Sequence, residues 1–507
     1  MGDVVQGILS ALQWQTVVAS ALGCALGIVA GALPGITISM GLVLLLPVTF
    51  GLDPATAMSL LIGVYTGGMT GGSISAILLN IPGTPSAVMT GIDGHEMARR
   101  GQAGKAIGIA IWSSFIGGWV GWAALVLLAP LLARVALSFG APELFALMLL
   151  GMTVICSFSE GSIVKGLLAG VVGLVIMTVG MDPVVGVERF TFGQVELQAG
   201  ISFLAAMIGL FAIPQVILGL RSEGPRPPSR PPEVPFSEML PSLGDLRRIL
   251  KPSLWAGAIG TAVGIVPGTG GAIAAVLAYD QARRMSKAPQ EFGKGSPEGI
   301  AAPEAANDGV TGGALIPTLT LGIPGDPPTA VLLGALVIQG LYAGPLLFER
   351  NAAVVYGILT TFAIAKFWTV ILTLLGIKAF VQVLRVPASM LFPAVAALTV
   401  VGSYAIRNSV FDCFIMAGLG VLGYFLTQWR FPLMPIVLAL VLGPPLEEHL
   451  RTSLVISGGD VTTFIRRPVS AALLALAVLM VAAQLPWRRW ARALAPITVG
   501  SSPGGRP

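Results

Sequence analysis

Long apolar runs separated by short polar stretches make up most of the chain. The clearest runs cover residues 17–32, 107–128, 163–179, 201–220, 354–375 and 471–483. A helix needs about 20 apolar residues to cross a bilayer, so these runs predict membrane-spanning helices. Shorter runs broken by Gly or Pro fill much of the rest. The pattern predicts an all-α integral membrane protein with roughly a dozen membrane segments, half-helices included.

Composition excludes a water-soluble particle. Of the 507 residues, 55% are hydrophobic and 10% are charged, whereas soluble domains carry about 25% charged residues. The net charge of +5 does not indicate nucleic-acid binding. The basic residues lie at the ends of apolar runs and in loops, where retention of Lys and Arg in the cytoplasm explains them.

The N-terminus, the cysteines and the absence of catalytic motifs argue against a cleaved signal peptide, a disulfide framework and an enzyme. Residues 1–6 contain neither a basic region nor a small-residue cleavage site, so we expect the first apolar run to be a retained span. Cys24, Cys156 and Cys413 are scattered through apolar runs, which argues against a disulfide framework and a zinc site. No nucleotide-binding, nucleophile or metalloprotease motif occurs, so the sequence predicts neither an enzyme nor a bound cofactor.

A Pro- and Arg-rich stretch divides the chain. Residues 221–252 cannot bury enough apolar surface to fold alone, and six of them are Arg or Lys, so we expect a cytoplasmic linker. The predicted organisation is a first transmembrane repeat at 1–220, this linker, a second repeat at 253–465, and a C-terminal transmembrane helix with a cytoplasmic tail at 466–507. Trp487 and its basic neighbours indicate an interfacial anchor in that tail.

Matching motifs in the two halves indicate an internal repeat. Gly31-Ala-Leu-Pro-Gly35 corresponds to Gly264-Ile-Val-Pro-Gly268, and Ile81-Pro-Gly-Thr-Pro85 corresponds to Ile323-Pro-Gly-Asp-Pro327. The loop after the first Ile-Pro-Gly motif is basic and its counterpart at 341–351 is not, whereas the reverse holds for the loops after the Pro-Gly motifs. Equivalent loops are therefore expected on opposite membrane faces, which is typical of inverted repeats in transporters.

The Pro-Gly motifs are the candidate functional elements. Proline interrupts a helix, and irregular backbone inside a membrane persists only where protein or a water-filled cavity covers it. Two such breaks per half predict discontinuous helices with re-entrant-type tips that meet near the bilayer midplane. Helix N-termini there attract an anion such as a carboxylate, and carbonyl ends with hydroxyl neighbours suit a cation. The competing interpretation is a set of kinks that only help packing.

We expect two groups of site residues. The predicted substrate-binding residues are Gly35, Ser73, Asn80, Pro82, Gly83, Thr84, Gly268, Thr269, Asn307, Pro324 and Gly325. The predicted cation-coupling residues are Asn80, Thr320, Asp308 and Asp326. The two aspartates are chosen because an ionisable residue at membrane depth is a functional candidate, and no metal is expected beyond a sodium ion.

Other charged residues have simpler expectations. Glu304 is assigned either to the entrance of the site or to stabilisation of a helix N-terminus. Asp53, which precedes a proline, is expected to cap a helix. Lys165, Lys366 and Arg407 are expected to extend from span ends toward water, with pairing to a substrate carboxylate as the alternative.

The motifs resemble one family closely. The segments at 31–37, 44–57 and 71–85, and in the second half those at 297–307 and 312–325, are similar to the large membrane subunit of tripartite tricarboxylate transporters. The resemblance implies a permease that works with a small membrane subunit and a periplasmic solute-binding protein. It also implies transport of tricarboxylates such as citrate, dicarboxylates or aromatic acids, driven by a sodium or proton gradient.

Two departures from the family pattern bear on the substrate. Asp308 stands where a second Asn is usual, and Asp326 stands where a small or hydroxyl residue is usual. Added acids repel a polyanion unless they are protonated or ion-bound.

The sequence therefore predicts a secondary active importer of small organic carboxylates in the bacterial inner membrane, with alternating access. A stand-alone ion-coupled permease and an ion channel are the alternatives, and the coupling ion stays open between sodium and proton.

Overall fold

The computed structural model describes residues 2–33, 35–158, 162–182, 185–221, 234–384 and 386–484, and these residues are mostly helical. Six described helices are long and apolar enough to cross a membrane: α2, α4, α6, α10, α16 and α18. This confirms an all-α, multi-pass membrane protein. The runs at 163–179 and 471–483 form shorter helices than expected, whereas the Gly-, Ser- and Thr-rich α4 was absent from the clearest predicted spans.

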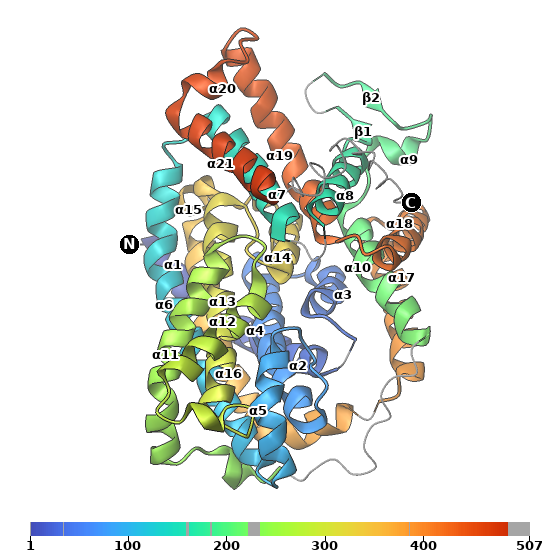
Figure 1. The fold of residues 1–507 in the computed structure, drawn as a ribbon. Coiled ribbons are helices and arrows are strands. Elements are labelled where there is room, and N and C mark those ends of the chain that lie inside the picture. Colours follow the sequence, from blue (N-terminus) through green and yellow to red (C-terminus); the bar gives the residue numbers. More distant parts are fainter. Residues whose placement is uncertain are drawn as a thin grey trace, which may run out of the picture.

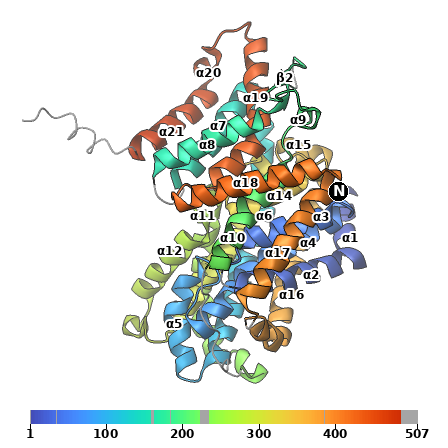
Figure 2. The same ribbon diagram turned by 90° about the vertical axis from the view of Figure 1, so that its right-hand side faces the viewer.

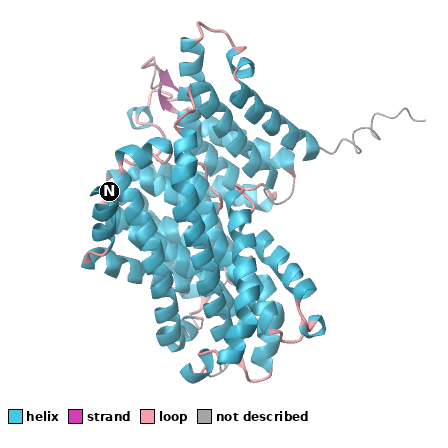
Figure 3. Cartoon of the chain, turned by 90° about the vertical axis from the view of Figure 1, so that its left-hand side faces the viewer, coloured by secondary structure: helices cyan, strands magenta, loops and turns pink. Residues whose placement is uncertain are grey.

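In the first half, the α-helices are α1 (Gly2–Ala11), α2 (Trp14–Ala32), α3 (Ile38–Thr49), α4 (Pro54–Leu79), α5 (Ala87–Arg99), α6 (Ala103–Ala136), α7 (Ala141–Phe158), α8 (Ile163–Met177), α9 (Val195–Gln198) and α10 (Phe203–Arg221). The second half contains α11 (Leu243–Ile265), α12 (Gly270–Met285), α13 (Pro297–Leu321), α14 (Pro327–Ile338), α15 (Pro345–Arg350), α16 (Ala352–Val383), α17 (Ala388–Arg407), α18 (Val410–Gln428), α19 (Met434–Ile456), α20 (Thr463–Arg466) and α21 (Pro468–Gln484). Two short 3-10 turns are η1 (Phe236–Met239) and η2 (Pro289–Glu291), and β1 (Gly180–Met181) pairs antiparallel with β2 (Glu188–Arg189), as Figure 3 shows.

Two closely packed helix pairs form the centre of the molecule. In the first half α2 packs on α4, and in the second half α11 packs on α13 (Figure 1). Glycines make both approaches close. A Cβ added at Gly27 would collide with the backbone of Val64 in α4, and a Cβ added at Gly260 would collide with the backbone of Ala306 in α13. In each half, therefore, a glycine without a side chain permits the close packing of the central helix pair.

One long helix from each half packs against the central helix pair of the other half. The first-half helix α6 packs on α11 and α13, whereas the second-half helix α16 packs on α2 and α4. The contact between α4 and α16 includes a hydrogen bond between the hydroxyl groups of Ser59 and Thr361, whose oxygens are 2.8 Å apart. The halves are thus interlocked.

The remaining helices surround this centre. The helices α3, α10, α17 and α18 pack together on one side, and α7, α8, α19 and α21 form a group at the upper end of Figure 1 (also seen in Figure 2). The largest core cluster joins residues of α3, α4, α10, α14 and α16, with Tyr65 and Phe362 among its fully buried side chains.

Capping residues explain where several helices begin. Asp53 accepts hydrogen bonds from the amides of Ala55 and Thr56, each at 3.1 Å, which confirms its expected role at the start of α4. Ser242 and Asp245 form a capping box that starts α11, so residues 243–252, which we expected in the linker, are helical. Residues 222–233 of the linker and 485–507 of the tail lie outside the described residues, and the proposed domain division stays a prediction.

Candidate functional site

Every Pro-Gly motif separates two helices. The breaks lie between α2 and α3, between α4 and α5 (residues 80–86), between α11 and α12 (residues 266–269), and between α13 and α14 (residues 322–326). Pro34, in the first break, lies outside the described residues. We name each break by its flanking helices, for example the α4–α5 tip. The helices therefore end at these motifs, as expected, whereas a meeting of the tips near the bilayer midplane stays a prediction.

The two Ile-Pro-Gly tips are built alike. Asn80 ends α4 in the left-handed conformation with φ of 57°, and Gly322 ends α13 in the same conformation with φ of 70°. At the next equivalent position, a Cβ added at Gly83 would collide with the carbonyl oxygen of Gly31, and one added at Gly325 would lie 2.7 Å from that of Gly264. In each half the tip glycine therefore packs on the glycine that precedes the other Pro-Gly motif.

The four helices that leave the tips differ in their capping. The hydroxyl of Thr37 accepts from the Met40 amide at the start of α3, and Asp326 forms a capping box with Thr329 at the start of α14. In contrast, Ser86 at α5 and Thr269 at α12 make no side-chain capping bond. The Thr269 hydroxyl instead donates to the carbonyl oxygens of Val263 and Val266. The first amides of α5 and α12 thus have no side-chain cap, although the Ala87 amide of α5 donates to the carbonyl oxygen of Thr84 at 3.0 Å.

These two uncapped ends face a buried amide. Helices α5 and α12 contact one another and α13, all three of which are labelled in Figure 1. A Cβ added at Gly271, in the first turn of α12, would collide with Oδ1 of Asn307 and lie 3.4 Å from Cβ of Ser86. Asn307 is 2% exposed, and its Nδ2 donates to the carbonyl oxygen of Met69, but its Oδ1 has no hydrogen-bond partner among the described residues. The α4–α5 and α11–α12 tips therefore converge on an unsatisfied acceptor.

This arrangement can hold an anion. A helix N-terminus carries about half a positive charge, and its free amides point at an incoming carboxylate or phosphate. Ser86 Oγ and Thr84 Oγ1, 3.1 Å apart, add hydroxyl groups beside the α5 end. The α11–α12 tip is partly exposed, and Asn80 and Pro82 in the α4–α5 tip are exposed, whereas residues 322–326 of the α13–α14 tip are buried. We call the set Thr84, Ser86, Gly271 and Asn307 the convergence site.

Asp326 lies at the position that corresponds to Thr84, but its carboxylate is already occupied. Oδ1 accepts from the amide of Thr329 at 3.0 Å and from its hydroxyl at 2.8 Å, and Oδ2 accepts from the Tyr65 hydroxyl at 2.6 Å. The Asp326 carboxylate therefore caps the N-terminus of α14, whereas the N-terminus of α5 has no such side-chain cap. Its contacts are those of a buried cap.

A buried ion pair lies at the centre of the molecule. Lys366 of α16 donates to Asp308 of α13, and both side chains are 2% exposed. The Lys366 ammonium also donates to Thr311 at 3.2 Å, and Asp308 accepts from Thr70 of α4 at 3.2 Å. Lys366 does not extend toward water as expected from the sequence, because it lies mid-helix and its stem packs on Gly118 of α6. The charge that Asp308 adds is thus neutralised within the protein.

Glu304 is a second buried acid, one turn before Asp308. It is 1% exposed and accepts from the hydroxyls of Thr90 in α5 at 2.5 Å and Ser114 in α6 at 3.1 Å. Neither expectation for this residue, a site entrance or an interfacial helix end, fits this burial. The residue lies in the third turn of α13, enclosed by neighbouring helices.

The other predicted residues are distributed as follows. The Gly268 amide donates to the carbonyl oxygen of Gly325 at 2.8 Å, which joins the two tips of the second half. Ser73 donates to the Thr70 carbonyl and Thr320 to the Ile316 carbonyl, both within their own helices. Gly35 is exposed beside the ring of Phe392, and Pro324 is buried in the α13–α14 tip. Of the predicted substrate residues, the structure brings Thr84 and Asn307 toward one site.

The four predicted cation residues do not surround a common point. Asp308 and Thr320 lie twelve positions apart on α13, which is about 18 Å along a helix, so one ion cannot contact both. Among the described residues, no group of three or more His, Cys, Asp or Glu gathers as a metal site.

One charged residue was misplaced by sequence reasoning and another was missed. The burial of Lys366 had a signal in the sequence, because the residue lies in the middle of the run 354–375, too far from either end for its side chain to reach water. Asp93 had none. It accepts from the amides of Gly293, Gly295 and Ser296, each at 2.8 Å, and thereby fixes the loop before α13 to α5.

Comparison with known proteins identifies the family. The family model described as tripartite tricarboxylate transporter TctA matches residues 17–438. This chain belongs to the TctA family of tripartite tricarboxylate transporters. Two proteins of Agrobacterium vitis are similar to it. One, described as an uncharacterized 52.8 kDa protein in the TAR-I ttuC' 3' region, is 41% identical over 473 residues, which is 93% of each chain. The other, from the TAR-II ttuC' 3' region, is 40% identical over 222 residues, which cover 44% of this chain and 92% of that protein.

No solved structure matches the chain. Membership in the TctA family confirms the resemblance inferred from the motifs and identifies the chain as a subunit of a tricarboxylate transporter. Systems of this family have in general a binding protein and a small membrane subunit.

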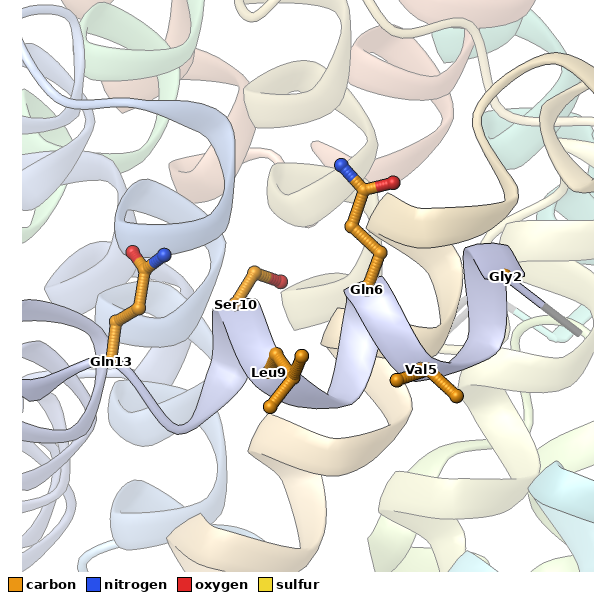
Figure 4. Close-up of a pocket in the computed structure, with 6 residues that line it drawn as sticks. All are labelled: Gly2, Val5, Gln6, Leu9, Ser10 and Gln13. Atoms are coloured by element: carbon orange, nitrogen blue, oxygen red, sulfur yellow. The ribbon is translucent and has the colours of Figure 1, made fainter.

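One surface hollow lies apart from the tips. It is lined by α1 and the residues after it, with Gln6, Ser10 and Gln13 pointing to one side of the helix and Val5 and Leu9 to the other (Figure 4). It contains no charged residue and none of the tip motifs, so it plays no part in the site.

Proposed function

We propose that this TctA-family protein is the permease subunit of a secondary active importer for small organic carboxylates of the tricarboxylate and dicarboxylate class. It works in the bacterial inner membrane with a periplasmic solute-binding protein and a small membrane subunit, and an ion gradient drives it. The observation that carries this proposal is the convergence of two uncapped helix N-termini on the unsatisfied Oδ1 of Asn307.

The substrate carboxylate binds between the first turns of α5 and α12. Each end offers amides and a partial positive charge, and the hydroxyls of Thr84 and Ser86 lie beside them. Asn307 Oδ1 is an acceptor and does not bond the carboxylate itself; it accepts from a water bound beside the carboxylate, or from a hydroxyl of a hydroxy acid such as citrate. An unsatisfied buried acceptor costs about 1–3 kcal/mol, so a ligand that supplies the donor gains affinity.

Two features of the chain support binding of an anion despite the extra acids. Asp308 is neutralised by Lys366, and Asp326 is held by the α14 N-terminus and Tyr65. Neither adds a free negative charge next to the carboxylate.

Inverted repeats explain how such a site is reached from both sides. Helix α5, which follows the α4–α5 tip, lies toward the lower end of Figure 1, whereas its counterpart α14 lies higher, near the middle of the view. The charge pattern of the loops supports the same inversion. Three of the four convergence-site residues, Thr84, Ser86 and Asn307, are buried in this structure, and alternating access opens the site first to one side of the membrane and then to the other.

Replacing Asn307 with Ala is expected to lower uptake by up to about tenfold. Removing the hydrogen bond from a water or hydroxyl of the bound ligand to Asn307 costs about 0.5–1.5 kcal/mol, and 1.4 kcal/mol is a factor of about ten in affinity. The measurement is uptake of radiolabelled citrate, succinate and benzoate by proteoliposomes that contain this chain, its small subunit and its binding protein.

The control is Asn351→Ala, which changes an exposed Asn at the start of α16. Saturable uptake by the wild type and by this control, with loss in Asn307→Ala, supports the site. Uptake by Asn307→Ala at the wild-type rate contradicts it. Unsaturable conduction without substrate indicates a channel, and uptake without the binding protein indicates a stand-alone permease.

A further inference from the structure

We propose that Glu304 carries the proton that couples transport to a pH gradient, and that the carboxylate substrate and this proton bind together. The inference rests on the proposed function, because it names the coupling group beside the convergence site. It assigns the coupling ion as a proton.

The surroundings of Glu304 stabilise a neutral acid. Burying an ionised carboxylate without a cation or a metal costs many kcal/mol, and such groups neutralise instead. Among the described residues, Glu304 has no Lys, Arg or His within ion-pair distance, and its side-chain partners Thr90 and Ser114 are hydroxyls. A hydroxyl can accept from a carboxylic acid as well as donate to a carboxylate, so both protonation states keep their hydrogen bonds.

Several of the charged groups on the elements around Glu304 are engaged with other residues. On its own helix, Asp308 is paired with Lys366 of α16. On α5, Asp93 accepts from the amides before α13 and from Tyr279 of α12, His95 contacts the carbonyl oxygen of Ile77, and Glu96 pairs with Arg99. On α14, Asp326 is the cap. The ion pairs near the helix ends that join α6 to α11 and α11 to α13 are Lys105–Asp245 and Arg248–Glu298. On α12 and α15, the charged residues are Asp280, Arg283, Arg284, Glu349 and Arg350. The described part of α4 contains no Asp, Glu, Lys or Arg.

Glu304 is also one helical turn from the convergence site along two helices. Asn307 is three positions further on α13, and Thr90, which binds Glu304, is four positions after Ser86 on α5. Three to four positions correspond to about 5–6 Å along a helix. A negative charge on Glu304 therefore repels a carboxylate bound at the α5 end, and a proton on Glu304 removes that repulsion.

The transport cycle follows from this proximity. On the outside, the carboxylate binds when Glu304 is protonated. After the change of access, the substrate leaves, and Glu304 releases its proton to the less acidic cytoplasm. No covalent bond between heavy atoms changes in this cycle; the Glu304 carboxyl group only gains and loses a proton. By linkage, substrate affinity is highest at low pH and falls as pH rises.

Glu304→Gln tests the inference, because Gln copies the neutral acid and keeps contacts to both hydroxyls. In proteoliposomes with both partner subunits, an inward gradient of about one pH unit is expected to accumulate citrate, succinate or benzoate up to about tenfold in the wild type. Glu304→Gln is expected to exchange internal for external substrate, with an affinity that does not change with pH, but to accumulate none. The control is Glu298→Gln on the same helix, a partly exposed residue paired with Arg248, and it is expected to behave as the wild type.

A second measurement does not depend on the substrate. The infrared spectrum of the purified wild-type chain at neutral pH is expected to contain the carbonyl band of a protonated carboxyl group that Glu304→Gln lacks and Glu298→Gln retains. Equal spectra of wild type and Glu304→Gln overturn the inference. So does pH-driven accumulation by Glu304→Gln, or wild-type uptake that follows a sodium gradient and ignores pH. If no acid is taken up by the wild type, the proposed function fails, and the infrared band still decides whether Glu304 is protonated.

Discussion

Lys366→Met is expected to destabilise the folded protein strongly. The change leaves the carboxylate of Asp308 buried without its cation, and removing one partner of a buried ion pair costs about 3–5 kcal/mol. It also removes the hydrogen bond to Thr311. We expect a large loss of folded protein, measured as the fraction that elutes as a monodisperse peak from size-exclusion chromatography after heating in detergent.

The control and the rescue make this prediction specific. Lys378→Met changes an exposed lysine on the same helix and is expected to leave stability unchanged. Adding Asp308→Asn to Lys366→Met removes the unpaired charge and is expected to recover most of the lost stability, since replacing both partners of a buried pair is often neutral. A Lys366→Met protein as stable as the wild type would show that Asp308 carries no charge.

The sequence predicted the breaks in the helices because their causes are local. Proline removes a backbone donor wherever the chain folds, and the duplicated Ile-Pro-Gly motif follows a left-handed residue in both halves, at Asn80 and Gly322. The family resemblance rests on these same motifs. Helix caps such as Asp53 are local as well, and were predicted for the same reason.

The grouping of the site residues depends on contacts between distant segments. The convergence site joins Ser86 to Gly271, and no pattern near either residue specifies that α5 lies against α12. Sequence reasoning selected Asn307 and Thr84, which the structure brings near each other, but it could not group them, and it also included Thr320, whose hydroxyl bonds to its own helix.

Burial of the charged residues was hardest to predict. Whether Glu304 lies at an interface or in the core depends on α5 and α6, which supply Thr90 and Ser114 from distant parts of the chain. The burial of helix α4 was also hard to predict, in this case because its residues are small and only weakly apolar. Its Gly-, Ser- and Thr-rich sequence gives a modest hydropathy of 1.3, although it is entirely buried within the protein. Small residues there permit close helix packing rather than contact with lipid.

Gly83→Ala is expected to abolish transport by displacing the α4–α5 tip. The added methyl group would collide with the carbonyl oxygen of Gly31 and lie 2.8 Å from Oγ of Ser75. Backbone atoms at this contact cannot rotate away, and inserting a methyl group into a well-packed core costs about 1–3 kcal/mol. Moving the tip also moves the uncapped end of α5, so we expect uptake in proteoliposomes to fall below detection even where folded protein is recovered.

Gly91→Ala is the matched control, because it adds the same methyl group to the adjoining helix α5 at an ordinary 3.6 Å from the nearest atom. It is expected to transport as the wild type does. Gly325→Ala tests the second half, where the methyl group would lie 2.5 Å from Cα of Ala314 and 2.7 Å from the carbonyl oxygen of Gly264. If both tips take part in one transport cycle, the two variants lose uptake alike. Loss in Gly83→Ala with wild-type uptake in Gly325→Ala would instead restrict the moving site to the α4–α5 tip, and wild-type uptake by both would separate the tips from transport.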